Sequence, residues 1–81
     1  MENTYFYTIV FKGGSTLAGH NCTSFEIERD YIMEKYYLIL RGFDELNYTS
    51  GFETKHWGYR YELDEIVSFK VIKMRGDEEC L

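Results

Sequence analysis

The stretch FKGGSTLAGH, residues 11–20, decides the fold, because it places two adjacent glycines between two runs that are typical of strands. Before it, residues 4–12 are aromatic, apolar or β-branched at both alternating sets of positions, which favours a strand. Glycine adopts a positive φ without a Cβ clash, so Gly13 and Gly14 predict the two-residue turn of a hairpin.

The rest of the chain alternates in a similar way, with one irregular part. Gly19 lies inside the second predicted strand, residues 15–29, and predicts a bulge or bend that lets one long strand serve two sheets. We expect three further strands at residues 36–41, 57–63 and 67–74, a connection at 30–35, and a long loop at 42–55 with a short strand near 46–49.

Five or six short strands with little helix predict an all-β protein, a small antiparallel SH3-like barrel or sandwich. The chain of 81 residues is expected to form a single domain, with a β core over 4–74 and a flexible charged tail over 75–81. No proline interrupts a strand. A domain this short buries only a little over ~60% of its unfolded surface, so its many aromatic side chains matter for stability.

The formal net charge is −5, which disfavours non-specific binding to a nucleic-acid backbone. Two cysteines in unlike settings, Cys22 and Cys80, do not indicate a disulfide framework. The N-terminus lacks the pattern of a secretory signal peptide, and the apolar run YFYTIVF is too short to span a bilayer. The sequence therefore predicts a cytoplasmic protein without a membrane partner.

Residues 11–19 resemble the first motif of Sm-like proteins: a strand, a turn glycine, and a hydrophobic residue two positions before a second glycine. Residues 38–42, Leu-Ile-Leu-Arg-Gly, resemble that family's second motif, a strand that ends in Arg-Gly. The resemblance implies a small SH3-like barrel. It does not imply RNA binding, because the Asp…Asn pair that reads a base in that family has no counterpart after Gly19. In size, acidity and composition the chain is also similar to small phage or mobile-element proteins, anti-defence and anti-CRISPR proteins among them.

No constellation in the sequence predicts catalysis or metal binding. His20 and Cys22 fall on one side of the second predicted strand, but a zinc site needs three or four such ligands. Ser15 and Ser24 have no histidine and acid in a recognisable elbow, and no glycine-rich loop leads into a helix to hold a phosphate. We therefore expect neither an enzyme nor a metal or other cofactor.

The richest stretch for binding is KHWGYRY, where aromatic side chains share one strand face and cationic side chains lie beside them. The candidate binding residues are Lys55, His56, Trp57, Tyr59, Arg60 and Tyr61. Alternating aromatics also suit plain core packing, so both interpretations stay open. Charge favours a site: residues 55–75 carry five Lys or Arg and three acids, a net +2, whereas the other residues carry four and eleven, a net −7.

Two other surfaces are candidates for contact. The first predicted strand is apolar on both faces, which predicts self-association or contact with a partner protein through Tyr5, Phe6, Tyr7 and Val10. The acidic residues form the second surface, either a solvated face or a mimic of a polyanion: Glu2, Glu26, Glu28, Asp30, Glu34, Asp44, Glu45 and Glu53.

Two functional hypotheses follow. The first is a non-enzymatic, oligomeric interaction protein, an inhibitor from a phage or mobile element that acts in the host cytoplasm. Its partner would be a host defence protein, such as a nucleic-acid-guided nuclease. The alternative is a ligand-binding module that sequesters a nucleotide, or binds nucleic acid, through residues 55–61.

Overall fold

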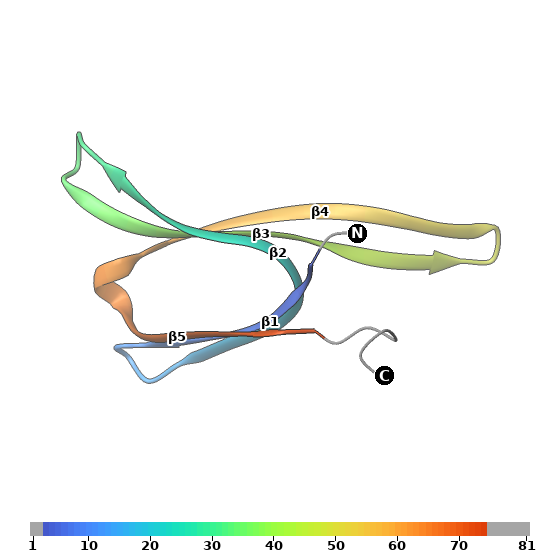
Figure 1. Cartoon of the computed structure of the whole chain (residues 1–81), viewed down its shortest axis with the longest axis horizontal. Coiled ribbons are helices and arrows are strands. Elements are labelled where there is room, and N and C mark those ends of the chain that lie inside the picture. Colours follow the sequence, from blue (N-terminus) through green and yellow to red (C-terminus); the bar gives the residue numbers. More distant parts are fainter. Residues whose placement is uncertain (1–2, 75–81) are drawn as a thin grey trace.

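The computed structural model describes residues 3–74 as one five-stranded antiparallel sheet with the spatial order β4-β3-β2-β1-β5 (Figure 1). The strands are β1 (Tyr5–Phe11), β2 (Thr16–Asp30), β3 (Lys35–Tyr48), β4 (Gly51–Glu62) and β5 (Ile66–Lys73), and one 3-10 turn, η1 (Leu63–Glu65), joins the last two. The predicted all-β class is confirmed. The predicted tail at 75–81 lies outside the described residues, and no helix within 3–74 is long and apolar enough to cross a membrane.

The long strand β2 folds the sheet over itself into two layers. Its first half pairs with β1, and its second half, from Cys22 onward, pairs with β3. One layer therefore contains β5, β1 and the first half of β2, and the other contains the second half of β2, β3 and β4 (Figure 1). Across the described residues the edge strands β4 and β5 are joined by η1 but not hydrogen-bonded to each other, so the sheet is curled but not closed.

The β1–β2 turn differs by one residue from the prediction. The Gly14 N–H donates to the Phe11 carbonyl at 2.9 Å, and the Phe11 N–H donates to the Ser15 carbonyl at 2.9 Å. The loop thus has three residues, Lys12 to Gly14, and of the two glycines only Gly14 has a positive φ, +94°. A turn followed by a left-handed glycine is the usual geometry of a three-residue hairpin loop.

Gly19 has a different role from the predicted one. It pairs with Tyr7, and a Cβ at Gly19 would meet the Tyr7 ring at 2.5–2.8 Å, so the glycine clears space for that ring. The bulge follows it: the register shifts between the pairs Tyr7↔Gly19 and Tyr5↔Cys22, and Asn21 takes a positive φ of 61°. The bend of β2 was therefore predicted in the right region but attributed to the wrong residue.

The loop predicted at residues 42–55 was wrong, although the short strand expected near 46–49 falls within β3, which ends at Tyr48. Strands β3 and β4 continue through it, paired from Phe43↔His56 to Tyr48↔Gly51, and this ribbon projects beyond the rest of the sheet (Figure 1). We call residues 43–56 the ribbon. The connection at 30–35 is a tight turn in which the Asp30 carboxylate accepts from the Ile32 and Met33 N–H groups at 3.0 and 3.1 Å.

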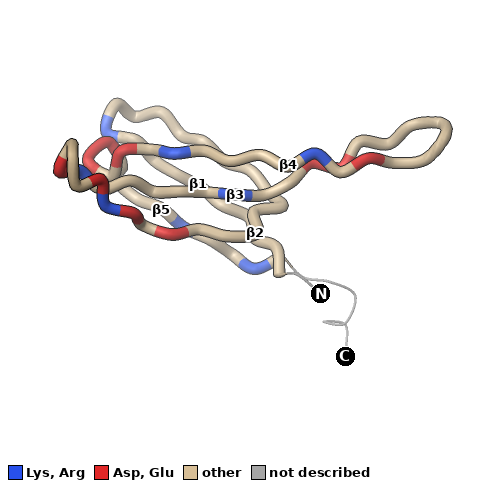
Figure 2. Tube along the Cα trace, turned by 90° about the horizontal axis from the view of Figure 1, so that it is seen from above, with Lys and Arg blue, Asp and Glu red and all other residues tan. Residues whose placement is uncertain are grey.

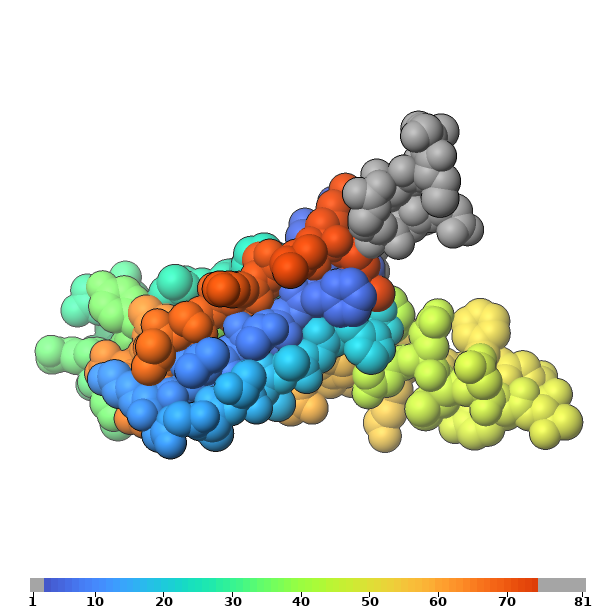
Figure 3. Space-filling view, turned by 90° about the horizontal axis from the view of Figure 1, so that it is seen from below, coloured from blue at the N-terminus to red at the C-terminus, as the bar shows by residue number. Residues whose placement is uncertain are grey.

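The core lies between the two layers. Its buried side chains are Tyr7, Ile9, Cys22, Leu38 and Leu40, and partly buried aromatics from β1, β4 and β5 pack around them. On β1 the inner and outer faces alternate as predicted: Ile9 is fully buried, whereas Phe6 is 48% exposed. Figure 3 shows the outer face of this layer, with β5, β1 and the first half of β2 side by side and the ribbon projecting past them.

Candidate interaction cleft

Three aromatic side chains form a ladder along the inner face of β4. The ring centroids of Trp57 and Tyr59 lie 5.2 Å apart and those of Tyr59 and Tyr61 lie 6.2 Å apart, each pair tilted by 32°. The Trp57 ring packs near Tyr7 (6.0 Å) and the Tyr61 ring near Phe11 (5.6 Å), so both ends of the ladder are anchored in the core. Tyr59 has no such anchor and is 48% exposed. The ladder is thus core at its ends and surface in its middle.

The position of Trp57 depends on a glycine in the neighbouring strand. Gly42 is its cross-strand partner, and a Cβ at Gly42 would overlap both the Trp57 ring and the Asn21 carbonyl oxygen. Gly42 thus allows the indole ring to lie directly on β3, where it meets Tyr7.

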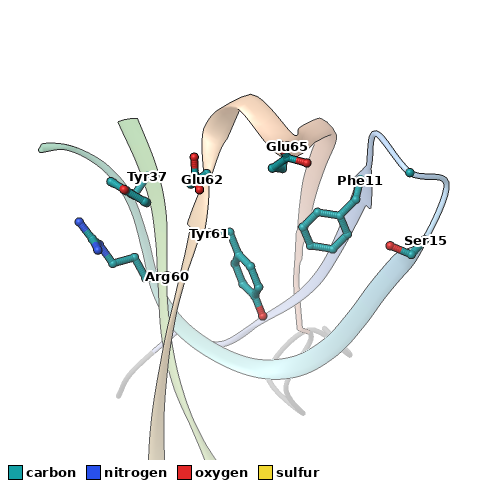
Figure 4. Close-up of a pocket in the computed structure, with 8 residues that line it drawn as sticks. Phe11, Ser15, Tyr37, Arg60, Tyr61, Glu62 and Glu65 are labelled. Carbon is teal, nitrogen blue, oxygen red and sulfur yellow. The ribbon is translucent and has the colours of Figure 1, made fainter. Parts of the chain in front are cut away.

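Two hollows lie end to end beside the ladder, the larger between the end of β4 and the β1–β2 turn and the smaller between β4 and the first half of β2. The larger, about 630 Å³, is lined by Phe11, Gly13, Ser15, Tyr37, Arg60, Tyr61, Glu62 and Glu65 (Figure 4). The smaller, about 220 Å³, is lined by Tyr7, Ala18, Gly19, His20, Asp44, Trp57 and Tyr59. We call the two together the aromatic cleft. The two hollows adjoin because their linings continue along the same segments. On one side the lining passes from Ser15 to residues 18–20, and on β4 it passes from Tyr61 back to Trp57.

The aromatic cleft is bordered by two strand edges, β4 along its length and β2 beside the smaller hollow. Within residues 3–74, strand β4 pairs only with β3, and residues 16–21 of β2 pair only with β1. Each rim therefore carries backbone N–H and C=O groups without a strand partner, the kind of edge to which another chain can pair.

Arg60 lines the larger hollow, but its side chain leaves β4 on the face opposite the ladder. Its guanidinium carbon sits 3.6 Å from the centroid of the Tyr37 ring, and its Nη2 donates to Asp30 Oδ2 at 3.2 Å. In Figure 4, the Arg60 and Tyr61 side chains point to different sides of strand β4. Backbone hydrogen bonds, from Met33 first, together with Arg60 lower the pKa of Asp30. Arg60, the cation expected beside the ladder, is thus paired with Asp30 at the end of β2.

The remaining predicted cations are spread out. Lys55 and His56 lie on the exposed ribbon, opposite Asp44 and Phe43. The described basic residues lie apart along several strands (Figure 2), and Lys35 and Arg41 form ion pairs with Glu62 and Glu26. The basic patch suggested by the charge of residues 55–75 is therefore not assembled in the described part of the chain.

The acidic residues also do not form one face. Those of the β2–β3 hairpin and those of the ribbon lie at opposite ends of the molecule (Figure 2), and Glu2 is outside the described residues. Two carboxylates line the aromatic cleft without forming an ion pair within residues 3–74: Glu65 in the larger hollow and Asp44 in the smaller.

The four predicted interface residues split between two faces. Tyr7 is buried and Tyr5 packs edge-on against Phe25 at 5.2 Å, whereas Phe6 and Val10 point to the outer face. The bulge in β2 separates a further predicted pair, because Cys22 is buried and His20 is exposed, 6.5 Å from the Phe6 ring. His20 and Cys22 were therefore wrongly placed on one side of β2.

The cleft has the chemistry of a binding site. Burial raises the pKa of Tyr7 and of Tyr61, so both phenols are neutral hydrogen-bonding groups at pH 7. No group of three or more His, Cys, Asp or Glu suited to a metal ion occurs within residues 3–74. The sequence did not reveal Phe11, Asp44 or Glu65 as cleft residues, because only the curl of the sheet brings them beside β4.

No family model, curated protein or solved structure matches the chain. The fold and the cleft define an open, curled five-stranded β domain with an aromatic groove between two free strand edges.

Proposed function

We propose that this chain is a non-enzymatic protein-binding module that takes a segment of a partner protein into the aromatic cleft. The observation that carries the proposal is Tyr59, a half-exposed ring held between Trp57 and Tyr61. Tyrosine and tryptophan are enriched among the residues that dominate binding energy. A ring whose neighbours are anchored loses little conformational entropy when it contacts a partner.

The charge around the cleft favours a protein partner over a nucleotide or nucleic acid. A phosphate group needs a free cation near the stacking rings. Arg60, the expected cation, lines the larger hollow, but its guanidinium is paired with Asp30 and lies over the Tyr37 ring, while Glu65 and Asp44 line the cleft without an ion pair within residues 3–74. These carboxylates would repel a phosphate and attract a basic segment of a protein.

Apolar side chains exposed outside the cleft also favour a protein that binds other proteins. The tip of the β2–β3 hairpin exposes Tyr31, Ile32 and Met33. An apolar groove of about 460 Å³ also opens between the second half of β2 and β5, where Phe25, Phe69 and the core residue Leu38 are among its lining. Large exposed apolar patches are rare on monomeric proteins, and where they occur they usually mark a contact surface. In its more specific form the proposal is an inhibitor of a host defence protein, which the size and acidity of the chain support.

The test compares two tyrosines of equal exposure. Tyr59 is 48% exposed inside the cleft, and Tyr36 is 49% exposed on the β2–β3 hairpin. Proteins captured from a host lysate by the wild type are identified, and their affinities are measured for the wild type, Tyr59→Ala and Tyr36→Ala. We expect Tyr59→Ala to weaken binding by about 30-fold, equivalent to ~2 kcal/mol, and Tyr36→Ala to leave it nearly unchanged.

Equal affinity of Tyr59→Ala and Tyr36→Ala for the partner would refute the proposal. A thermal-shift screen with nucleotides runs in parallel, since a ligand at 100 Kd stabilises by ~2.7 kcal/mol. Stabilisation by a nucleotide that disappears in Tyr59→Ala would replace the protein partner with the ligand alternative.

A further inference from the structure

The edge of β4 that faces the aromatic cleft has none of the usual protection against strand pairing. Proteins protect an edge with a proline, a bulge or an inward-pointing charge. The part of β4 beside the cleft, residues 57–61, pairs with β3 without a register shift, contains no proline, and points three aromatic side chains inward. Such an edge suits a strand that is added from another chain.

We propose, on the basis of the protein-binding function above, that the partner segment is an extended and basic one that adds as a strand to the free edge of β4. Its backbone would bond to β4, and alternate side chains would face the aromatic ladder. Residues 16–20 of β2 offer a second edge across the cleft that has no strand partner within residues 3–74, so the added strand would lie between two edges of the same sheet.

The basic character follows from the two cleft carboxylates. Asp44 is opposite Lys55 in the β3–β4 register, and Glu65 follows the end of β4 at Glu62. Seven residues separate positions 55 and 62, which corresponds to roughly 23 Å of strand. A complementary segment therefore carries Lys or Arg near both ends, about seven residues apart, with apolar or aromatic residues between them.

Charge also excludes a second copy of this chain as the favoured occupant. The chain has a net charge of −5, so a copy brought to this acidic cleft meets like charge. Two cations beside the cleft, Arg60 and Lys35, are already bound to Asp30 and Glu62, while Lys55 is opposite Asp44 and Lys12 donates its backbone N–H to the Glu65 carbonyl. The residues that line the two hollows are one cation, Arg60, and three carboxylates, Glu62, Glu65 and Asp44, a net charge of −2, and a basic segment from a different protein would balance it.

The first experiment selects displayed random peptides of about ten residues on the full-length protein, since strands of that length span the cleft. We expect enrichment of peptides with two basic residues about seven positions apart. The double variant Asp44→Asn with Glu65→Gln should bind the selected peptides about tenfold more weakly. The matched control, Glu28→Gln with Glu34→Gln, removes the same charge from the exposed β2–β3 hairpin and should bind like the wild type.

The second experiment measures amide hydrogen exchange of the protein with the best selected peptide. Strand addition predicts new protection at every second amide of β4 between residues 57 and 61. Enriched peptides without basic residues, no enrichment at all, or binding that leaves these amides unprotected would each overturn the inference. The proposed function is judged separately: it stands if a captured protein partner depends on Tyr59, even when the β4 amides remain unprotected.

Discussion

Gly42→Ala is the sharpest test of how the aromatic cleft is built. The added methyl group would overlap the Trp57 ring and the backbone oxygen of Asn21. A shift of the ring would disturb its packing near Tyr7, and the Asn21 oxygen belongs to the bulge that bends β2. The substitution therefore strains both the cleft and the bend of the sheet.

The expected cost is ~1–3 kcal/mol, the usual range for a methyl group forced into a packed site. A domain of this length has a total stability of about 4–12 kcal/mol, so the cost is a large fraction of it. It corresponds to a fall in melting temperature of about 4–8 °C for each kcal/mol. Gly58→Ala is the matched control, because its Cβ would meet only ordinary contacts, Leu40 O at 3.7 Å and the Arg41 side chain at 3.9 Å.

Thermal unfolding and intrinsic fluorescence measure both consequences at once, since Trp57 is the only tryptophan in the chain. We expect Gly42→Ala to melt several degrees lower with a shifted emission maximum, and Gly58→Ala to match the wild type in both. If Gly42→Ala melts within about 2 °C of the wild type with unchanged emission, the account of Trp57 and Gly42 is refuted.

Further substitutions test the core, the outer face and one carboxylate. Ile9→Ala should cost ~2–5 kcal/mol in a urea titration, because Ile9 is fully buried; a loss below ~1 kcal/mol would contradict the packing. We expect light scattering to show that the wild type is a dimer or larger. The double variant Phe6→Ser with Ile72→Ser should have a lower mass, because these two exposed residues are cross-strand partners on the outer face. A monomeric wild type would refute the association. The pKa of Asp30 is lowered in the folded protein, first by the Met33 N–H and also by Arg60, so its contribution to stability is present at neutral pH and is lost as pH falls through that pKa. Asp30→Asn should therefore lose less stability than the wild type as the pH is lowered from 7 through that pKa, and an equal loss would contradict the lowered pKa.

The sequence predicted the strands wherever one face is buried. Along β1, alternation placed Tyr7 and Ile9 on the inner face and Phe6 on the outer one, and burial follows that pattern. Apart from the short strand expected near 46–49, the ribbon was missed, because both of its faces are largely exposed and residues 43–56 have no regular apolar alternation. Pairing with a neighbouring strand, which the sequence does not display, holds it extended.

The site was predicted in part for the same reason. The period of two placed Trp57, Tyr59 and Tyr61 on one face, as the ladder has them. Their neighbours depend on contacts between distant segments: Asp30 reaches Arg60 across 30 positions of the chain, and the curl of the sheet brings Ser15 beside β4. Local patterns carry no information about such contacts.

Photo-crosslinking tests the central claim most directly, that a partner protein binds in the aromatic cleft. A benzoylphenylalanine is introduced in place of Tyr59 and, in a second protein, in place of Tyr36, which is equally exposed outside the cleft. Each protein is irradiated in the presence of the captured partner. The account predicts a covalent product from position 59 and none from position 36. A product from position 36 alone, or from neither position while the partner remains bound, would contradict it.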